Sequence, residues 1–206
     1  MNTFSKVAVL ASLAVTASAQ KGRFEAKPAA SYAARQSVEK VTIAVEPYES
    51  GPKQKEAFGK ANPSQFGVLP VLVVIANDSD TVLDLERMRV EFVTADRQRV
   101  EPTPSEEIHL SGKIRRPDLG PQPPQPIPGV KIGGRKPKPD WEISAREFVA
   151  PVLPPRSSAH GFFYFRLDGA QLLSGAKVYI AGIRDAKTAR DLFYFEIELD
   201  PYVKSR

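Results

Sequence analysis

The residues best suited to bind a partner lie in one basic, proline-rich stretch, residues 113–140. It contains eight prolines and four glycines, and proline favours extended backbone that loses little entropy on binding. Its cations would attract an acidic surface, either an envelope protein or an anionic cell-envelope polymer. A solvated, disordered loop without a partner is the alternative. The candidate partner-binding residues are Arg115, Arg116, Lys131, Arg135, Lys136, Lys138 and Trp141, the only tryptophan of the chain.

Catalytic and metal-binding patterns are weak along the whole sequence. The absence of cysteine removes thiol nucleophiles, cysteine-based metal sites and disulfides. His109 and His160 are far apart and have no partner at metal-ligand spacing, and no Gly-x-Ser-x-Gly elbow is present. Gly129, Gly133 and Gly134 lack the Gly-Lys-Ser/Thr ending of a phosphate-binding loop. We therefore expect no enzymatic activity and no cofactor, and a hydrolase with an unrecognised site is the lowest-ranked alternative.

A group of acidic residues leaves a calcium site open as an alternative. Hard cations need several converging oxygens, but the glycine and the terminal glutamate of a helix-loop-helix calcium loop are missing. A solvated turn is the interpretation that we favour. The residues concerned are Asp78, Asp80, Asp84 and Glu86.

Three tyrosines on predicted strands, Tyr164, Tyr179 and Tyr194, leave a second alternative open. Aromatic rings on one sheet face would offer a flat apolar platform to sugars. Aromatic residues in strands more often pack in the core or against the sheet. The platform is therefore the minor interpretation.

The first 19 residues are typical of a signal peptide. Lys6 precedes an apolar run, and Ala17 and Ala19 stand where a signal peptidase reads small residues. The apolar segment has about 13 residues, whereas a membrane span needs roughly 20. We expect cleavage after Ala19, no lipid anchor because cysteine is absent, and no transmembrane segment in the mature chain. The protein is then exported, and is periplasmic or secreted.

The charge balance sets a limit on partners. Loss of Lys6 with the signal peptide lowers the formal net charge from +5 to +4. This excess is mildly basic and too small to argue for nucleic acid, so we expect none as a partner.

The first half of the mature chain predicts strands and one short helix. Residues 20–37 have little periodicity and predict a flexible N-terminal segment. Alternating apolar residues predict strands at 41–46 and 88–92. Residues 68–75 are almost continuously apolar and β-branched, which is typical of a strand buried on both faces. Residues 52–60 allow one or two helical turns with Ala57 and Phe58 facing inward.

The second half predicts further strands on the far side of the insertion. A hairpin turn leads into a short strand around Val100, and the aromatic run that begins at Gly161 requires cover on both faces. The later strands are expected at residues 145–151, 161–167, 177–183 and 193–199, the last with Phe193, Phe195, Ile197 and Leu199 on one face.

These elements predict an all-β fold. About seven or eight short strands separated by turns favour an antiparallel β-sandwich, with a β-barrel as the alternative. We expect one domain over residues 38–202, with 113–140 as a long Pro/Gly-rich loop insertion. The oligomeric state stays open.

Three segments carry a resemblance to a known group. They are residues 69–79 (LPVLVVIANDS), 161–165 (GFFYF) and 192–199 (LFYFEIEL). In their order and turn chemistry they resemble the immunoglobulin-like β-sandwich domains of uncharacterised exported bacterial proteins. The resemblance implies an immunoglobulin-like sandwich over residues 41–200. It brings no catalytic or ligand-binding residue with it.

The sequence thus favours a binding function over an enzymatic one. We expect a non-enzymatic binding or assembly module of the bacterial cell envelope that presents the basic, proline-rich loop. The alternative is a carbohydrate- or polymer-binding β-sandwich that uses tyrosines on a sheet face.

Overall fold

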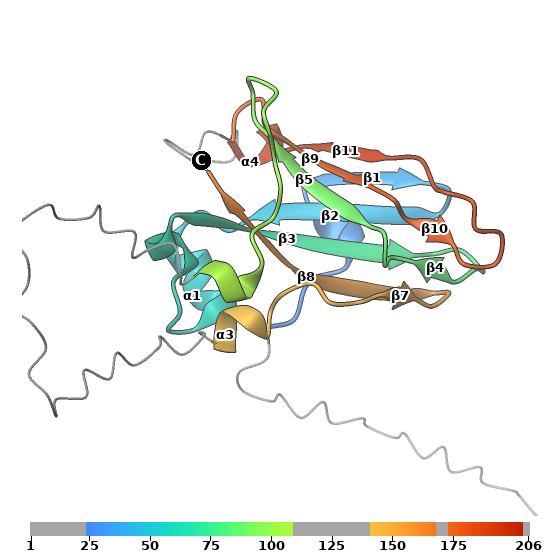
Figure 1. The fold of residues 1–206 in the computed structure, drawn as a ribbon, viewed down its shortest axis with the longest axis horizontal. Coiled ribbons are helices and arrows are strands. Elements are labelled where there is room, and N and C mark those ends of the chain that lie inside the picture. The colour runs from blue at the N-terminus through green and yellow to red at the C-terminus, as the bar shows by residue number, and fades with distance from the viewer. Residues whose placement is uncertain (1–23, 109–140, 168–172, 204–206) are drawn as a thin grey trace, which may run out of the picture.

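The computed structural model describes residues 24–108, 141–167 and 173–203 (Figure 1). The predicted signal peptide and the proline-rich insertion, residues 1–19 and 113–140, lie outside these ranges. The described strands form three separate antiparallel sheets, not the single closed sheet of the alternative. The prediction of an all-β antiparallel fold is confirmed.

Sheet A has the strand order β1-β2-β3-β8. Its strands are β1 (Ala34–Val38), β2 (Val41–Pro47), β3 (Val68–Asn77) and β8 (Ser157–Arg166). Every residue of β3 except Ala76 is buried, because β3 lies between two strands and has both faces covered. The prediction of a central, doubly buried strand at 68–75 is confirmed.

Sheet C has the order β11-β9-β5-β6 and one wet face. Buried and accessible residues alternate along β9 and β11, as expected for strands with a single covered face. Its strands are β5 (Arg89–Val93), β6 (Arg99–Val100), β9 (Lys177–Ala181) and β11 (Phe195–Glu198). The small sheet B joins β10 (Arg184–Asp185), β4 (Leu83–Asp84) and β7 (Val152–Leu153).

A first hydrophobic core lies between sheets A and C. Val73 of β3, Phe92 of β5 and Phe195 of β11 are all fully or almost fully buried in it. The rings of Phe92 and Phe165 meet across the two sheets, with centroids 5.7 Å apart. Each such side chain stabilises the fold by roughly 1.5–3 kcal/mol, so this core binds the two sheets together.

A second core lies on the opposite face of sheet A. Phe58 of α1 contacts Phe162 of β8 with ring centroids 4.7 Å apart, and Ile143 of α3 is buried in the same cluster. Sheet A is therefore the middle of three layers. The helical segments are η1 (Ala29–Ser31), α1 (Gly51–Phe58), η2 (Pro63–Phe66), η3 (Ser105–Glu107), α3 (Trp141–Ser144) and α4 (Asp200–Val203).

The two ends of the strands carry different structures. Figure 1 shows α1 and α3 at one end and β4, β7 and β10 at the other. No helix among the described residues is both long and apolar enough to cross a bilayer.

Two predicted elements are corrected by the structure. The flexible segment 20–37 is wrong in its second half, because β1 pairs with β2 from Ala34 onward; an edge strand needs few apolar residues. The strand at 145–151 is also wrong, since residues 146–148 form only an isolated bridge to Phe162 of β8. Strand β7 begins later, at Val152.

Candidate functional site

Six of the seven candidate partner-binding residues lie outside the part of the chain that the structure describes. They are Arg115, Arg116, Lys131, Arg135, Lys136 and Lys138. Trp141 is described: it begins α3 and is 72% exposed. Its neighbour Glu142 accepts a hydrogen bond from the backbone N–H of Ala61 at 3.1 Å, which fixes α3 against the chain after α1.

The three-tyrosine platform predicted from the sequence is wrong for Tyr164. This side chain is fully buried in the second core, and its hydroxyl donates to the carbonyl of Ile143 at 2.8 Å. Burial raises the pKa of the Tyr164 phenol. Tyr179 and Tyr194 are brought together, with stacked rings whose centroids are 5.5 Å apart.

Two of the four acidic residues considered as calcium ligands already have local partners. Asp80 pairs with Arg156 at 2.7 Å, and the hydrogen bond from this guanidinium lowers the pKa of the carboxyl. Asp84 accepts the backbone N–H of Glu86 at 2.9 Å. Within the described ranges, no three acidic or histidine side chains are grouped as metal ligands. His160 is exposed on β8 and meets the ring of Phe24 edge-on at 6.1 Å.

A break in sheet C begins at Gly182, immediately after β9. Its φ is +80°, and a Cβ at this position would lie 2.2 Å from the carbonyl oxygen of Arg87. Only glycine tolerates both conditions. The chain therefore passes directly against the residues that precede β5.

Beyond the break, the two chain segments on either side of the turn after β10 pair with each other. Arg184 bridges Asp191, and the backbone N–H of Leu192 donates to the carbonyl of Ile183 at 2.8 Å. The next regular pair is Phe195 with Ile180. Residues 192–194 thus cross the break without forming a ladder.

Two neighbouring aromatic residues are exposed at this break. Phe193 is 69% exposed and Tyr194 is 53% exposed, although a regular strand would turn one of two neighbours inward. The sequence-based assignment of Phe193 to the buried face is therefore wrong. Irregular backbone opposite Gly182 explains why both rings reach solvent.

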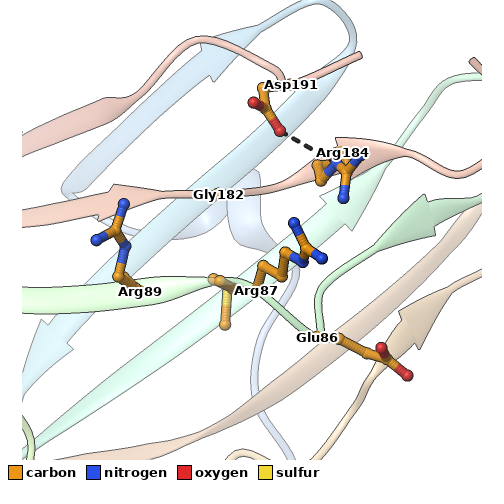
Figure 2. A pocket seen from close by; sticks show the side chains of 7 residues that line it. Glu86, Arg87, Arg89, Gly182, Arg184 and Asp191 are labelled. Carbon is orange, nitrogen blue, oxygen red and sulfur yellow. Dashed lines mark ion pairs between the residues drawn. The ribbon is translucent and has the colours of Figure 1, made fainter. Parts of the chain in front are cut away.

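An open cleft of about 560 Å³ adjoins the break (Figure 2). Its basic residues are Arg87, Arg89 and Arg184, which come from both sides of the gap between β5 and β10. Figure 2 shows the carboxylate of Glu86 directed away from these guanidinium groups. The lining residues are Glu86, Arg87, Met88, Arg89, Gly182, Arg184 and Asp191.

The three arginines differ in their partners. Arg184 is held by Asp191 at 3.2 Å and donates to the carbonyl of Ala189 at 3.2 Å. The exposed guanidinium groups of Arg87 and Arg89 have no hydrogen bond or ion pair with any residue in the described ranges. They are therefore available to an anionic ligand.

Other cations on the outer face of sheet C are already compensated. Arg99 pairs with Glu91 at 2.7 Å, and its guanidinium lies 4.9 Å from the ring centroid of Tyr179. Lys177 pairs with Glu196 at 2.9 Å, and the hydrogen bond with this carboxylate raises the pKa of the lysine. Arg99 and Lys177 thus differ from Arg87 and Arg89, which have no such partner in the described ranges.

We name these features together the arginine-aromatic face. Guanidinium groups present planar sets of N–H donors that suit carboxylate and phosphate groups, and exposed aromatic rings offer flat apolar surface. The cleft lining contains no serine, threonine, cysteine, lysine or histidine that would act as a nucleophile. The face consists of Arg87, Arg89, Tyr179, Arg184 and Tyr194.

The sequence pattern alone does not reveal this face, apart from its two tyrosines. Arg87 and Arg89 alternate with Met88 and Val90, so they match the ordinary wet side of a strand. Phe193 and Tyr194 match an alternating strand in the same way. The available signal was Gly182, because a glycine directly after a strand often marks a bulge or a close backbone approach.

Comparisons with known proteins add little. No family model matches the chain, and no curated protein is similar to it. Among solved structures, a functionally unknown protein from Listeria monocytogenes EGD-e has 13% sequence identity and a TM-score of 0.35, with 79% of each chain covered. A likeness this weak carries no argument about fold or function.

Proposed function

We propose that the protein is a non-enzymatic binding module of the bacterial cell envelope that holds an anionic polymer on the arginine-aromatic face. The observation that carries this proposal is the pair of unpaired arginines at the cleft, Arg87 and Arg89, with the exposed ring of Tyr194 two strands away from Arg89 in the sheet register. Export is part of the proposal and is supported by the signal-peptide pattern of residues 1–19.

The shape of the site favours a polymer over a small metabolite. Sites for small molecules usually enclose most of the ligand surface, whereas this cleft is open and continues onto a wet sheet face. A chain of repeating units would lie across such a face. Hydrogen bonds to charged groups contribute roughly 1.5–3 kcal/mol each, so two arginines that contact neighbouring units at the same time give a measurable affinity.

Two further features belong to the same proposal. The packing of sheet A on sheet C supports an immunoglobulin-like sandwich as the scaffold, with a helical layer added on one side. The basic stretch predicted at residues 113–140 would add positive charge for the same anionic partner, or contact an envelope protein.

The test uses the chain from residue 20 and two anionic probes, polygalacturonate and polyphosphate. We expect both to bind, and the double variant Arg87→Ala, Arg89→Ala to bind them at least about tenfold more weakly. Added salt should weaken the wild-type affinity, because it screens exposed charges. Isothermal titration calorimetry measures each affinity.

A matched control removes two charges from the other end of the molecule. Lys55→Ala with Lys60→Ala changes the net charge by the same amount, and both side chains are exposed on or just after α1. We expect this variant to bind within about twofold of wild type. Equal losses in the two variants, or no binding of either polymer to the wild type, would overturn the proposal.

A further inference from the structure

Arg89 and Tyr194 lie on either side of β9 on the arginine-aromatic face. Arg89 pairs with Ala181 of β9. Tyr194 falls opposite Ala181 from the other side, because the neighbouring pair is Phe195 with Ile180. Two strand spacings of about 4.8 Å place the two backbones about 10 Å apart.

The residue between them in the strand register is Ala181, whose side chain is only a methyl group. No large side chain of β9 therefore separates Arg89 from Tyr194. A single sugar residue that bears an acidic group can span this gap. The ring would lie on the aromatic side and the acidic group on the arginine side.

The ring of Tyr194 is held in place before any ligand arrives. It stacks on Tyr179 with an interplanar angle of 30°, and Arg99 lies 4.9 Å from the centroid of Tyr179. Arg99 is itself fixed by Glu91 at 2.7 Å. Such preorganisation lowers the entropy lost on binding, which favours a ligand with a flat apolar face.

Resting on the proposed function, we infer that the preferred ligand is an acidic glycan. One sugar ring packs on Tyr194, and a carboxylate of that sugar is bound by Arg89 with Arg87. A polyphosphate chain satisfies the arginines alone, because it has no apolar ring face. The aromatic half of the site therefore sets the preference between the two kinds of polymer.

The test compares Tyr194→Ala with wild type on three probes: polygalacturonate, polyphosphate and neutral dextran. We expect Tyr194→Ala to bind polygalacturonate about fivefold to tenfold more weakly, the loss of one aromatic contact. Its affinity for polyphosphate should stay within about twofold, since the arginines remain. Dextran, which lacks a carboxylate, should bind at least about tenfold more weakly than polygalacturonate.

Two further variants show that the effect comes from the ring. Tyr194→Phe keeps the aromatic face and should retain the affinity for polygalacturonate. Val149→Ala shortens another exposed apolar side chain, 79% exposed, outside sheet C and should change nothing. Circular dichroism of each variant checks that it is folded.

The outcomes separate this inference from the proposed function. Unchanged polygalacturonate binding in Tyr194→Ala, with weakened binding in the double arginine variant, overturns the acidic glycan and leaves anionic-polymer binding standing. Equal losses for both anionic probes in Tyr194→Ala, or dextran binding as tight as polygalacturonate, also overturn it. If the wild type binds no polymer, the proposed function fails as well.

Discussion

At Gly182 the backbone adopts a left-handed φ of +80° and passes so close to Arg87 that a methyl group would lie 2.2 Å from its carbonyl oxygen. The same residue directly follows β9 and stands opposite Phe193, the neighbour of Tyr194. One glycine thus positions both the arginine side and the aromatic side of the site. Its role is conformational, because it offers no functional group.

Replacement of Gly182 by alanine should therefore lower the stability of the fold and also distort the site. We expect Gly182→Ala to lower the free energy of unfolding by about 2–4 kcal/mol, from backbone strain and steric overlap. Urea unfolding measures the loss. The control is Gly51→Ala at the start of α1, where no atom lies within 4 Å of the added methyl group. Equal unfolding midpoints for the two variants would contradict the role given to Gly182.

Strand β1 lies at the edge of sheet A and has contacts on both of its sides. It pairs with β2 along its whole length, from Ala34 with Val45 to Val38 with Val41. On its other side, the amide oxygen of Gln36 accepts the backbone N–H of Glu196 at 2.8 Å. This contact joins the free edges of sheets A and C, so β1 closes one side of the sandwich.

Removal of β1 should expose the edge of β2. We expect a chain that begins at residue 40 to lose about 3 kcal/mol or more of stability, because buried Tyr32 and Ala34 go with the strand, and to aggregate through the open edge. A chain that begins at residue 24 keeps β1 and should unfold at the same temperature as the chain from residue 20. Thermal unfolding and size-exclusion chromatography compare them. Identical behaviour of the two truncations would refute the closing role.

Elements with a strong apolar period were predictable from the sequence. Strand β3 is a continuous β-branched run, and β5 and β9 alternate clearly, so each lies where its pattern indicates. Helix α1 was found from its proline and glycine limits. Local pattern was enough in these cases because burial imposes it directly.

Elements that depend on distant partners were not predictable. The two-residue strands β4, β7 and β10 pair with one another, and nothing in so short a segment encodes a partner. Residues 146–148 lie along β8 because Gly161 leaves room there: a Cβ on it would be 2.4 Å from the Cα of Phe148. The site was hidden for the same reason, since only the fold decides that Arg87 and Arg89 stay without a carboxylate.

The whole molecule consists of three layers with sheet A in the middle. One core contains Phe92 and Phe165, and the other contains Phe58 and Phe162. Tyr48 and Tyr164 are buried in the second core, and Tyr202 packs against the first. Burial raises the pKa of Tyr48, Tyr164 and Tyr202 above the ordinary value of 10.0.

These raised pKa values predict a loss of stability at alkaline pH. Below the unfolded-state pKa of 10.0, the tyrosines are neutral in both states, so their burial has no penalty. As the pH rises above that value, the unfolded chain releases protons that the folded chain retains, and stability falls until the folded-state pKa is passed. Urea midpoints measured from about pH 8 to 11 should decline over the alkaline part of that range.

The variant Tyr164→Phe tests the cause of this decline. At neutral pH it should lose about 1 kcal/mol, because the hydrogen bond to Ile143 is gone. Its stability should then fall less steeply with rising pH than that of the wild type. Parallel curves for the two proteins would show that Tyr164 does not contribute.

The three-layer arrangement also separates the positions that evolution must keep from those it can change. Both faces of β3 are committed to packing, so substitutions there are costly whichever way the side chain points. The outward positions of sheet C, such as Tyr179 and Glu196, face solvent and do not enter either core. A lineage could thus exchange residues on this face and acquire a new ligand while its folding information stays intact.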